Sequence, residues 1–526
     1  MGPSIMVSNM ALVAGVDTST QSCKIVIRDA DTGELIRSGS AKHPDGTEID
    51  PKFWWDAFLE ASAAAGGLDD VAAISIGGQQ HGMVVLDNDG NVIRPALLWN
   101  DTRSAGAAEE LINQLGREKL GEGASDETAI RAAGAQEFAT IVGSVPVASL
   151  TVTKLKWLND NEPEAAARVA AVALPHDWLS WRIAGYGPAG DPTAPNGPQL
   201  DKLFTDKSDA SGTGYYDAEA NNGVGAYRGD LLKMALGRGV ASELDGGDGV
   251  ALPRVLTPTE SGGVANPEIA GKDVPGGCLI GPGAGDNAGA AIGLGMQPGD
   301  IAISIGTSGV VSAVAPTRTA DGSGAINGFA DATGNALMLA VTLNAAQVLD
   351  AARNITGSDF QQLSDRALAA PPGSDGLVLV PYLQGERTPN RPDASGTLHG
   401  IRLKNMTPEH ISRAYIEGML AGLADGLDAL RAQNVPINRV MLIGGAAQSP
   451  AVQEVATQVF GLPISIPEPG EYVADGAARQ AAWVLASTHA GGPVEQPGWS
   501  TQMSKTLPAN PQPIVREQYA AVRDLV

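Results

Sequence analysis

Residues 11–28 read Ala-Leu-Val-Ala-Gly-Val-Asp-Thr-Ser-Thr-Gln-Ser-Cys-Lys-Ile-Val-Ile-Arg, and this stretch sets the expectation for the fold. Its two apolar ends, 11–16 and 23–28, predict strands, because runs of Val, Ile and Leu favour extended chain. The small polar residues 17–22 predict the turn between them. We therefore expect a β-hairpin with a long polar tip.

A second stretch near the middle of the chain has the same pattern. Residues 301–305 predict a strand, 306–309 a tight turn, and 310–314 the return strand. Each hairpin opens a long segment of alternating strands and helices, which is typical of an α/β fold. The repetition indicates a duplicated fold, and chance likeness of two short hairpins is the alternative.

The rest of the chain is also predicted to alternate strands and helices. Strands are expected at 71–76, 169–174 and 439–443, helices at 54–65, 288–296, 409–433 and 450–460, and loops at 120–125, 185–198 and 315–324. Thr407 and Ser449 are expected to cap the last two helices. We expect the boundary between two domains near 281–299.

Charge and cysteine content exclude several classes of function. The chain of 526 residues has a net charge of −24, which repels DNA and anionic lipid, so nucleic-acid and membrane partners are not expected. Cys23 and Cys278 have no metal-binding spacing and fit a reducing compartment. Residues 1–9 lack the features of a signal peptide, and no apolar run approaches the roughly 20 residues of a membrane helix. We expect a soluble, cytoplasmic protein.

The stretch 281–291, Gly-Pro-Gly-Ala-Gly-Asp-Asn-Ala-Gly-Ala-Ala, places Asp286 at the start of a predicted helix of small residues. The glycines leave room for a ligand to lie against the backbone. A carboxylate there can take a proton from a sugar hydroxyl, and the helix N-terminus favours phosphoryl oxygens. The alternative is that Asp286 caps the helix, and the residues alone leave both interpretations open.

Asp17 follows the first predicted strand and precedes the hydroxyl-bearing turn that contains Thr20. A carboxylate in this position can hold Mg²⁺, mainly through water, and the turn amides and Thr20 can contact phosphate. The alternative is an Asx-turn, in which the side chain of Asp17 accepts a hydrogen bond from its own turn.

Two further segments carry side chains suited to a sugar. His81 lies on the Gly-flanked segment 77–83, where its imidazole can bond hydroxyls, unless it bonds only a backbone carbonyl. Trp99 stands beside polar residues, as in many carbohydrate sites, unless it is a partly buried anchor. The turn 444–449 follows a strand and resembles many nucleotide-binding turns, but it is no Walker A loop. Hydrolase and zinc motifs are absent from the sequence.

Taken together and in order, these segments resemble the FGGY carbohydrate kinases. The matching stretches run from about residue 12 to 485 and comprise 15–17, 77–83, 98–103, 208–213, 285–288, 304–309, 381–389 and 442–445. One of them contains the signature Gly385-Glu386-Arg387-Thr388-Pro389, to which the resemblance attaches no role.

The resemblance implies an α/β fold of two actin-like (ribonuclease-H-like) domains with a catalytic cleft between them. It implies a sugar-binding domain at 11–285, an ATP-binding domain at 286–490 and a C-terminal extension at 491–526. It implies a kinase that uses ATP and Mg²⁺, and within the family the chain is most like members that phosphorylate the 5-hydroxyl of D-xylulose. A homodimer is a candidate assembly.

The resemblance also implies roles for individual residues. Asp286 would be the general base, and Asp17 would hold the metal. The sugar would contact Gln80, His81, Trp99, Asp286 and Asn287. The nucleotide and its phosphates would contact Asp17, Thr20, Gly306, Thr307, Ser308, Gly444, Gly445 and Ala446.

The sequence departs from the family pattern at two positions. Ser19 stands where the first phosphate loop usually has Gly, and Gln80 stands where Met commonly precedes the histidine. The first change bears on the phosphate contact, and the second on the choice of acceptor. Other acceptors such as ribulose, gluconate or glycerol are alternatives, as are an actin-like ATPase without sugar phosphorylation and a sugar sensor that has lost catalysis.

Overall fold

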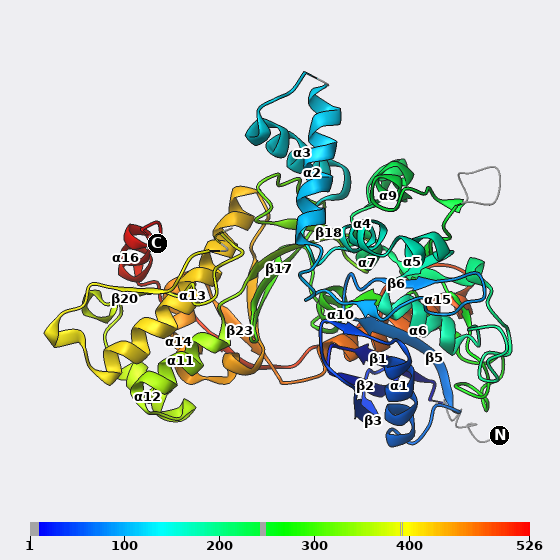
Figure 1. Cartoon of the computed structure of the whole chain (residues 1–526). Helices are drawn as coiled ribbons and strands as arrows, with labels where there is room; N and C mark the ends of the chain where they lie inside the picture. The colour runs from blue at the N-terminus through cyan, green and yellow to red at the C-terminus, as the bar shows by residue number, and fades with distance from the viewer. Residues whose placement is uncertain (1–9, 122, 242–248, 390, 392, 526) are drawn as a thin grey trace, which may run out of the picture. The chain divides into compact units, whose positions relative to one another are not determined.

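The computed structural model describes residues 10–121, 123–241, 249–389, 391 and 393–525, so the expectation about a signal peptide in residues 1–9 lies outside the described part (Figure 1). The chain divides into two compact units. The first contains residues up to 295, 329–334 and 470–500, and the second contains 296–328, 335–469 and 501–526. The domain limits expected from the resemblance stay a prediction.

The first unit is built on a seven-stranded sheet, in which β1 pairs antiparallel with β2 and parallel with β5. The hairpin predicted at 11–28 is thus confirmed. The sheet has the order β13 (Gly263–Val264), β14 (Leu279–Ile280), β5 (Val71–Gly78), β1 (Leu12–Thr18), β2 (Ser22–Asp29) and β3 (Leu35–Lys42), with β15 (Ala284–Gly285) also paired to β5.

Helix α1 (Lys52–Ala64) packs against β2 and β3, and α15 (Tyr472–Ala490) packs against β1 and β5 (Figure 1). Helix α15 also contacts α10 (Asp286–Gly293) closely. A Cβ on Gly476 of α15 would lie 1.8 Å from the carbonyl oxygen of Gly289 in α10. The small residues of α10 therefore allow the two helix backbones to touch, and the helix ends at Gly293 rather than at the expected 296.

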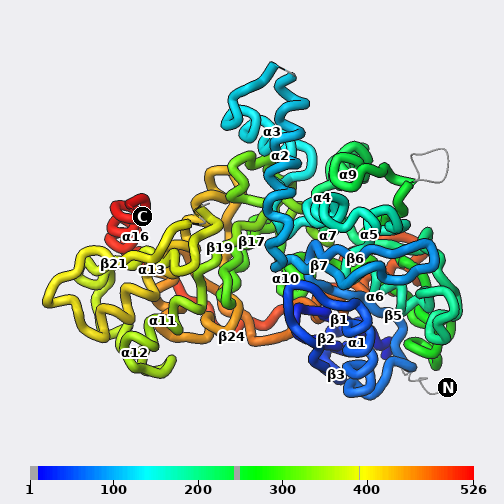
Figure 2. The backbone as a smooth tube through the Cα atoms, in the orientation of Figure 1, coloured from blue at the N-terminus to red at the C-terminus, as the bar shows by residue number. Residues whose placement is uncertain are grey.

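The remaining helices of the first unit include α2 and α3, which pack against each other and extend away from the sheet (Figure 2). Their backbones also approach closely, since a Cβ on Gly134 would lie 1.8 Å from the oxygen of Ile112. The helices are α2 (Ala105–Leu120), α3 (Glu127–Val142), α4 (Thr151–Asn161), α5 (Pro163–Arg168), α6 (Pro175–Ile183), α7 (Lys207–Ser211), α8 (Ala220–Gly223) and α9 (Gly229–Leu236).

Short strands complete the first unit. The strand predicted at 169–174 is shorter than expected, spanning 171–173. These strands pair as β4 (Glu48–Ile49) with β7 (Ala96–Leu97), β6 (Val84–Leu86) with β8 (Ala171–Ala173), β9 (Phe204–Asp206) with β12 (Arg254–Leu256), and β10 (Tyr216–Asp217) with β11 (Ala226–Tyr227).

Another seven-stranded sheet belongs to the second unit, apart from the last two residues of β18, which are counted with the first unit; in it β16 pairs antiparallel with β17 and parallel with β22. A hairpin beside a parallel strand thus occurs in both sheets, which supports the interpretation of a duplicated fold. The order is β18 (Asn327–Ala330), β19 (Ala336–Thr342), β17 (Gly309–Ala315), β16 (Asp300–Ile305), β22 (Arg439–Ile443), β23 (Ile464–Pro467) and β24 (Met503–Leu507).

Helices cover this second sheet, and α13 contacts β17 and β19. Thr407 caps α13 as expected, because its side chain accepts a hydrogen bond from the N–H of His410. Ser449 occupies the cap position of α14, but its hydroxyl makes no capping bond, so that expectation was only partly right. The helices are α11 (Ala346–Thr356), α12 (Phe360–Ala369), α13 (Pro408–Ala432), α14 (Pro450–Phe460) and α16 (Pro513–Val522), and the small strands β20 (Val378–Val380) and β21 (Thr397–His399) pair separately.

In the described part of the chain, no helix is both long and apolar enough to cross a membrane.

The contact between α10 and α15 leads to a first prediction. Gly476→Ala would force a methyl group against backbone atoms that cannot rotate away, so we expect the free energy of unfolding to fall by about 2–3 kcal/mol. Urea denaturation measures this change. Gly492→Ala is the control, because a Cβ there meets nothing within 4 Å, and we expect almost no effect. Equal stability of the two variants would contradict the close packing.

Candidate active site

Strand β5 gathers the candidate residues of the first unit. On one side it pairs in parallel with β1, where Asp17 is opposite Gly77, and on the other with β15, where Gly285 is opposite Gly78. The carboxyl ends of these three strands therefore meet at one edge of the sheet. Asp17, the segment after Gly78 and Asp286 all emerge there.

Asp17 lies inside β1, with its side chain almost completely buried. Its Oδ1 makes no hydrogen bond within the described residues. The N–H of Ser19, which an Asx-turn would need as donor, bonds the carbonyl oxygen of Ser22 instead, so the Asx-turn alternative does not hold. Burial and, second, repulsion from Asp286 raise the pKa of Asp17 to about 7, while Lys24 opposes this rise. A buried carboxylate oxygen without a hydrogen-bond donor suits a cation.

The residues around Asp17 fit Mg²⁺ only as part of a larger complex. No cluster of three or more His, Cys, Asp or Glu side chains that could hold a metal occurs among the residues that the structure describes. Mg²⁺ characteristically keeps water and binds one or two carboxylates together with substrate phosphates. The single carboxylate of Asp17 matches that mode and does not match an all-protein metal cage.

The turn after Asp17 accommodates the departure at Ser19. The N–H and hydroxyl of Ser19 both donate to the carbonyl oxygen of Ser22, at 3.0 Å each. Ser19 does not have the positive φ that would favour glycine. The hydroxyl of Thr20 accepts a hydrogen bond of 3.2 Å from Nε1 of Trp99, whose side chain is 41% exposed. Trp99 is therefore neither deeply buried nor isolated from the predicted phosphate turn.

Asp286 is the first residue of α10, and Gly285 is the residue at the cap position. The interpretation of Asp286 as the helix cap is therefore wrong. Its Oδ1 accepts hydrogen bonds from the N–H of Asn287 at 2.7 Å and from Nδ2 of Asn287 at 2.9 Å. Burial raises the pKa of Asp286, while the hydrogen bonds from Asn287 and the electrostatic influence of the nearby His81 imidazole act against that rise.

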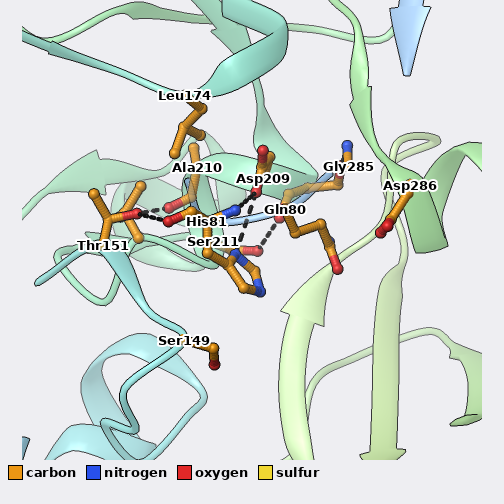
Figure 3. A network of polar contacts seen from close by, with 12 residues as sticks. Gln80, His81, Ser149, Thr151, Leu174, Asp209, Ala210, Ser211, Gly285 and Asp286 are labelled. Atoms are coloured by element: carbon orange, nitrogen blue, oxygen red, sulfur yellow. Dashed lines mark hydrogen bonds and ion pairs between the residues drawn. The ribbon is translucent and has the colours of Figure 1, made fainter. Parts of the chain in front are cut away.

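Asn287 connects Asp286 with the segment that follows β5. Its Nδ2 also donates to Oε1 of Gln80 at 2.9 Å. Gln80 and His81 are both buried, at 5% and 7% exposure, and lie near Asp286 (Figure 3). Four of the predicted sugar-binding residues, Gln80, His81, Asp286 and Asn287, thus form one polar group.

The sequence did not predict which residues hold His81. Its carbonyl oxygen accepts a hydrogen bond of 3.1 Å from the hydroxyl of Thr151, and its main-chain N–H donates to Oδ1 of Asp209 at 3.1 Å. Asp209 lies in the segment 208–213, which matched the family without a role. The place of Asp209 in a family-matching segment was the one hint in the sequence that it has a role. No spacing in the sequence connects Asp209 with His81.

The predicted nucleotide residues of the second unit lie at the ends of two neighbouring strands. The turn 306–308 follows β16, and Gly444 follows β22, which is parallel to β16. Gly444 has a φ of +92°, and a Cβ there would lie 2.7 Å from the carbonyl oxygen of Ile305, so glycine is required. A Cβ on Gly445 would meet nothing within 4 Å, which leaves open backbone beside the turn.

The signature 385–389 forms a clamp in the same unit. Both carboxylate oxygens of the buried Glu386 accept hydrogen bonds: Oε1 from the N–H of Leu343 at 2.7 Å and of Arg387 at 2.8 Å, and Oε2 from Nδ2 of Asn344 at 3.0 Å. Nδ2 of Asn344 donates in turn to the oxygen of Gly385 at 2.7 Å.

The segment held by this clamp continues to the turn after β16. The N–H of Ala346 donates to the carbonyl oxygen of Gly306 at 2.8 Å. The signature therefore supports the predicted phosphate turn indirectly, through residues 343–346.

These features define a protein with two units of actin-like topology, a buried carboxylate (Asp17) at one strand end and a partly buried one (Asp286) after another, and glycine turns suited to a nucleotide. Models of the FGGY family of carbohydrate kinases match the chain at 12–125 and 126–293 for the N-terminal domain and at 301–485 for the C-terminal domain. The chain therefore belongs to the FGGY family of carbohydrate kinases. The expected class of enzyme and the expected α/β two-domain fold are confirmed.

Individual relatives agree with this assignment. The chain is 41% identical over 505 residues to the xylulose kinase of Streptomyces coelicolor, covering 95% of this chain and 92% of the relative. It is 30% identical over 483 residues to the xylulose kinase of Escherichia coli, covering 89% of each. The crystal structure of xylulose kinase from Bifidobacterium adolescentis matches with a TM-score of 0.88 at 50% identity, covering 98% of this chain and 100% of that one.

The raised pKa of Asp17 predicts a pH-dependent cost of folding. The folded state favours the protonated acid, so the contribution of Asp17 to stability is largest near pH 4 and is lost as the pH rises through about 7. Asp17→Asn has no such titration. In metal-free buffer, we expect the variant to gain stability over the parent from pH 4 to pH 7.5, by up to about 4 kcal/mol. A difference that urea unfolding finds constant across this range would contradict the prediction.

The clamp predicts a loss of stability in Glu386→Ala. One buried donor and two part-buried donors would lose their acceptor, so we expect the free energy of unfolding to fall by about 3 kcal/mol. Thermal and urea unfolding measure this, with Glu517→Ala on the exposed side of α16 as the control. If the two variants were equally stable, the hydrogen bonds of Glu386 would not stabilise this unit.

Proposed function

We propose that this chain transfers the γ-phosphate of ATP to the 5-hydroxyl of D-xylulose, giving D-xylulose 5-phosphate and ADP. Relatives named xylulose kinase, at 41% and 50% identity over nearly the whole chain, support this acceptor. The observation that carries the proposal is the polar group of Asp286, Asn287, Gln80 and His81, which offers one base and several hydrogen-bonding groups to a polyol.

In the proposed reaction, Asp286 takes the proton from the 5-hydroxyl as that oxygen attacks the γ-phosphorus in line. Its raised pKa makes the carboxylate a stronger base than an exposed aspartate. The hydrogen bonds from Asn287 fix the orientation of Oδ1. The other sugar hydroxyls bond Gln80, His81 and Asn287, and the half-exposed ring of Trp99 packs against the sugar.

The proposed phosphate contact of the first unit is the hydroxyl of Thr20, and the proposed nucleotide contacts of the second unit are the turn 306–308 and the backbone at 444–446. Because these turns present N–H groups without bulky side chains, they can approach phosphoryl oxygens and stabilise their charge. When bound, Mg²⁺ would be held by Asp17 and would neutralise negative charge on the phosphates. Thr307 is exposed, so its hydroxyl is accessible to a ligand.

We also propose a cellular location, ligands and an assembly for this protein. We infer that the protein acts in the cytoplasm, with Mg-ATP and a small sugar as its ligands and no nucleic-acid partner, which its net charge of −24 supports. A homodimer is the proposed assembly.

The test is ADP release, coupled to a spectrophotometric assay, with xylulose, ribulose, gluconate, glycerol and no sugar. We expect a high rate that depends on xylulose. Asp286→Ala is expected to fold and to lose a factor of about 10²–10⁴ in kcat, as general bases do. Asp69→Ala, which changes an exposed aspartate, is the control.

Two outcomes would contradict the proposal. Equal slow ADP release with and without every sugar would indicate an actin-like ATPase. Undiminished turnover by Asp286→Ala would exclude Asp286 as the base while leaving the acceptor assignment intact.

A further inference from the structure

His81 has an uncommon backbone conformation. Its φ is +67°, in the left-handed region that L-residues with a side chain rarely adopt, and the residue is buried. Such a conformation persists only where surrounding contacts enforce it, and it is concentrated at functional sites. The contacts that hold His81 in this conformation therefore help to shape the site.

Asp209 supplies the most direct of these contacts (Figure 3). Its Oδ1 accepts the main-chain N–H of His81 at 3.1 Å, and the same oxygen lies 3.3 Å from Nδ1 of the imidazole. One carboxyl oxygen thus faces both the backbone and the ring of His81. The hydroxyl of Thr151 holds the carbonyl of His81 from the other side.

The imidazole ring is also confined by its packing. A Cβ on Gly212 would lie 2.0 Å from Cε1 of His81, so the ring occupies space that any other residue at 212 would fill. The ring of Phe329 lies against it, with centroids 5.3 Å apart. The ring therefore has little freedom to turn away from Asp209.

The second carboxyl oxygen of Asp209 faces the interior. Asp209 is fully buried in α7, and its Oδ2 lies 3.5 Å from Nε2 of His176, which is also fully buried. Burial lowers the pKa of His176 to about 3, so this imidazole is neutral. Burial also raises the pKa of Asp209 well above its usual range. A proton on Asp209 can therefore sit on Oδ2 towards His176, which leaves Oδ1 an acceptor for His81.

We propose that Asp209 is a positioning residue that holds His81 in its left-handed conformation with the ring proton on Nδ1, so that Nε2 is presented to the acceptor sugar as a hydrogen-bond acceptor. The part that concerns the sugar rests on the proposed function. A sugar hydroxyl then donates to Nε2, and an acceptor sugar without a hydroxyl at that point loses this hydrogen bond. A site of this kind discriminates strongly against the analogue that lacks the group.

The test compares two substitutions of Asp209. Asp209→Asn keeps an oxygen towards His81 and places an N–H group towards Nε2 of His176, so we expect nearly unchanged kinetics. Asp209→Leu has a similar size and no acceptor. We expect its KM for xylulose to rise about tenfold to a hundredfold, with the KM for ATP unchanged.

The control is Thr213→Val, which removes a buried polar group, a hydroxyl, from the same segment 208–213. That hydroxyl donates to the oxygen of Ala210 at 2.7 Å and is bonded by the N–H of Tyr215 at 3.3 Å. We expect lower stability without a change in the KM for xylulose. A rise in that KM equal to the rise in Asp209→Leu would show a general loss of packing and overturn the positioning role.

A second measurement does not depend on any variant of Asp209 or on turnover. Nitrogen-15 shifts of the imidazoles in the full-length protein report the tautomer, and the resonances missing from His81→Asn identify His81. We expect protonated Nδ1 and unprotonated Nε2 in the parent protein near neutral pH. The opposite tautomer would overturn the proposal even if xylulose is the substrate. The expected tautomer would support the positioning role of Asp209 even if another sugar is the substrate.

Discussion

The central position of β5 is the constraint on which the first unit depends. Because β1 and β15 both pair with it in parallel, segments separated by more than 200 residues deliver their polar ends to one edge of the sheet. The hydrogen-bonding register then places Asp17 opposite Gly77 and Gly285 opposite Gly78. The backbone ladder, rather than any contact between side chains, sets which residues meet.

This arrangement brings negative charges together inside a chain that is already acidic. Burial and the nearby charge of Asp286 both raise the pKa of Asp17. Burial raises the pKa of Asp209 most, and the charge of Asp286 raises it further. The ionised carboxylates are therefore unfavourable in this site unless a cation or a proton binds there. A positively charged ligand that binds beside these carboxylates stabilises their ionised form.

Much of the fold could be predicted from local sequence. The hairpins at 11–28 and 301–314 follow from apolar runs around polar turns, and the cap at Thr407 follows from its place before Pro408. The role of Ser449 did not follow, because a serine at a cap position makes its bond only if its rotamer allows. Asp286 was ambiguous because residue order does not reveal whether a helix begins at an aspartate or before it.

The candidate site was predictable only where one segment carries its own chemistry. Gln80, His81 and Asn287 matched family segments, but the bond from Nδ2 of Asn287 to Gln80 joins residues more than 200 positions apart. The pairing of His81 with Asp209 is of the same kind. Single-sequence patterns describe periods of two and about four residues, so contacts across such separations leave no trace in them.

The place of α15 in the first unit affects when this unit can complete its folding during synthesis on the ribosome. Residues of β1 and β5 form a small apolar cluster with Ala481, Ala482 and Leu485 of α15, close to the end of the chain. During synthesis from the N-terminus, that face of the sheet stays uncovered until some 480 residues have emerged. The nascent chain thus carries an exposed apolar surface for most of its elongation, which is the kind of surface that holdase chaperones shield.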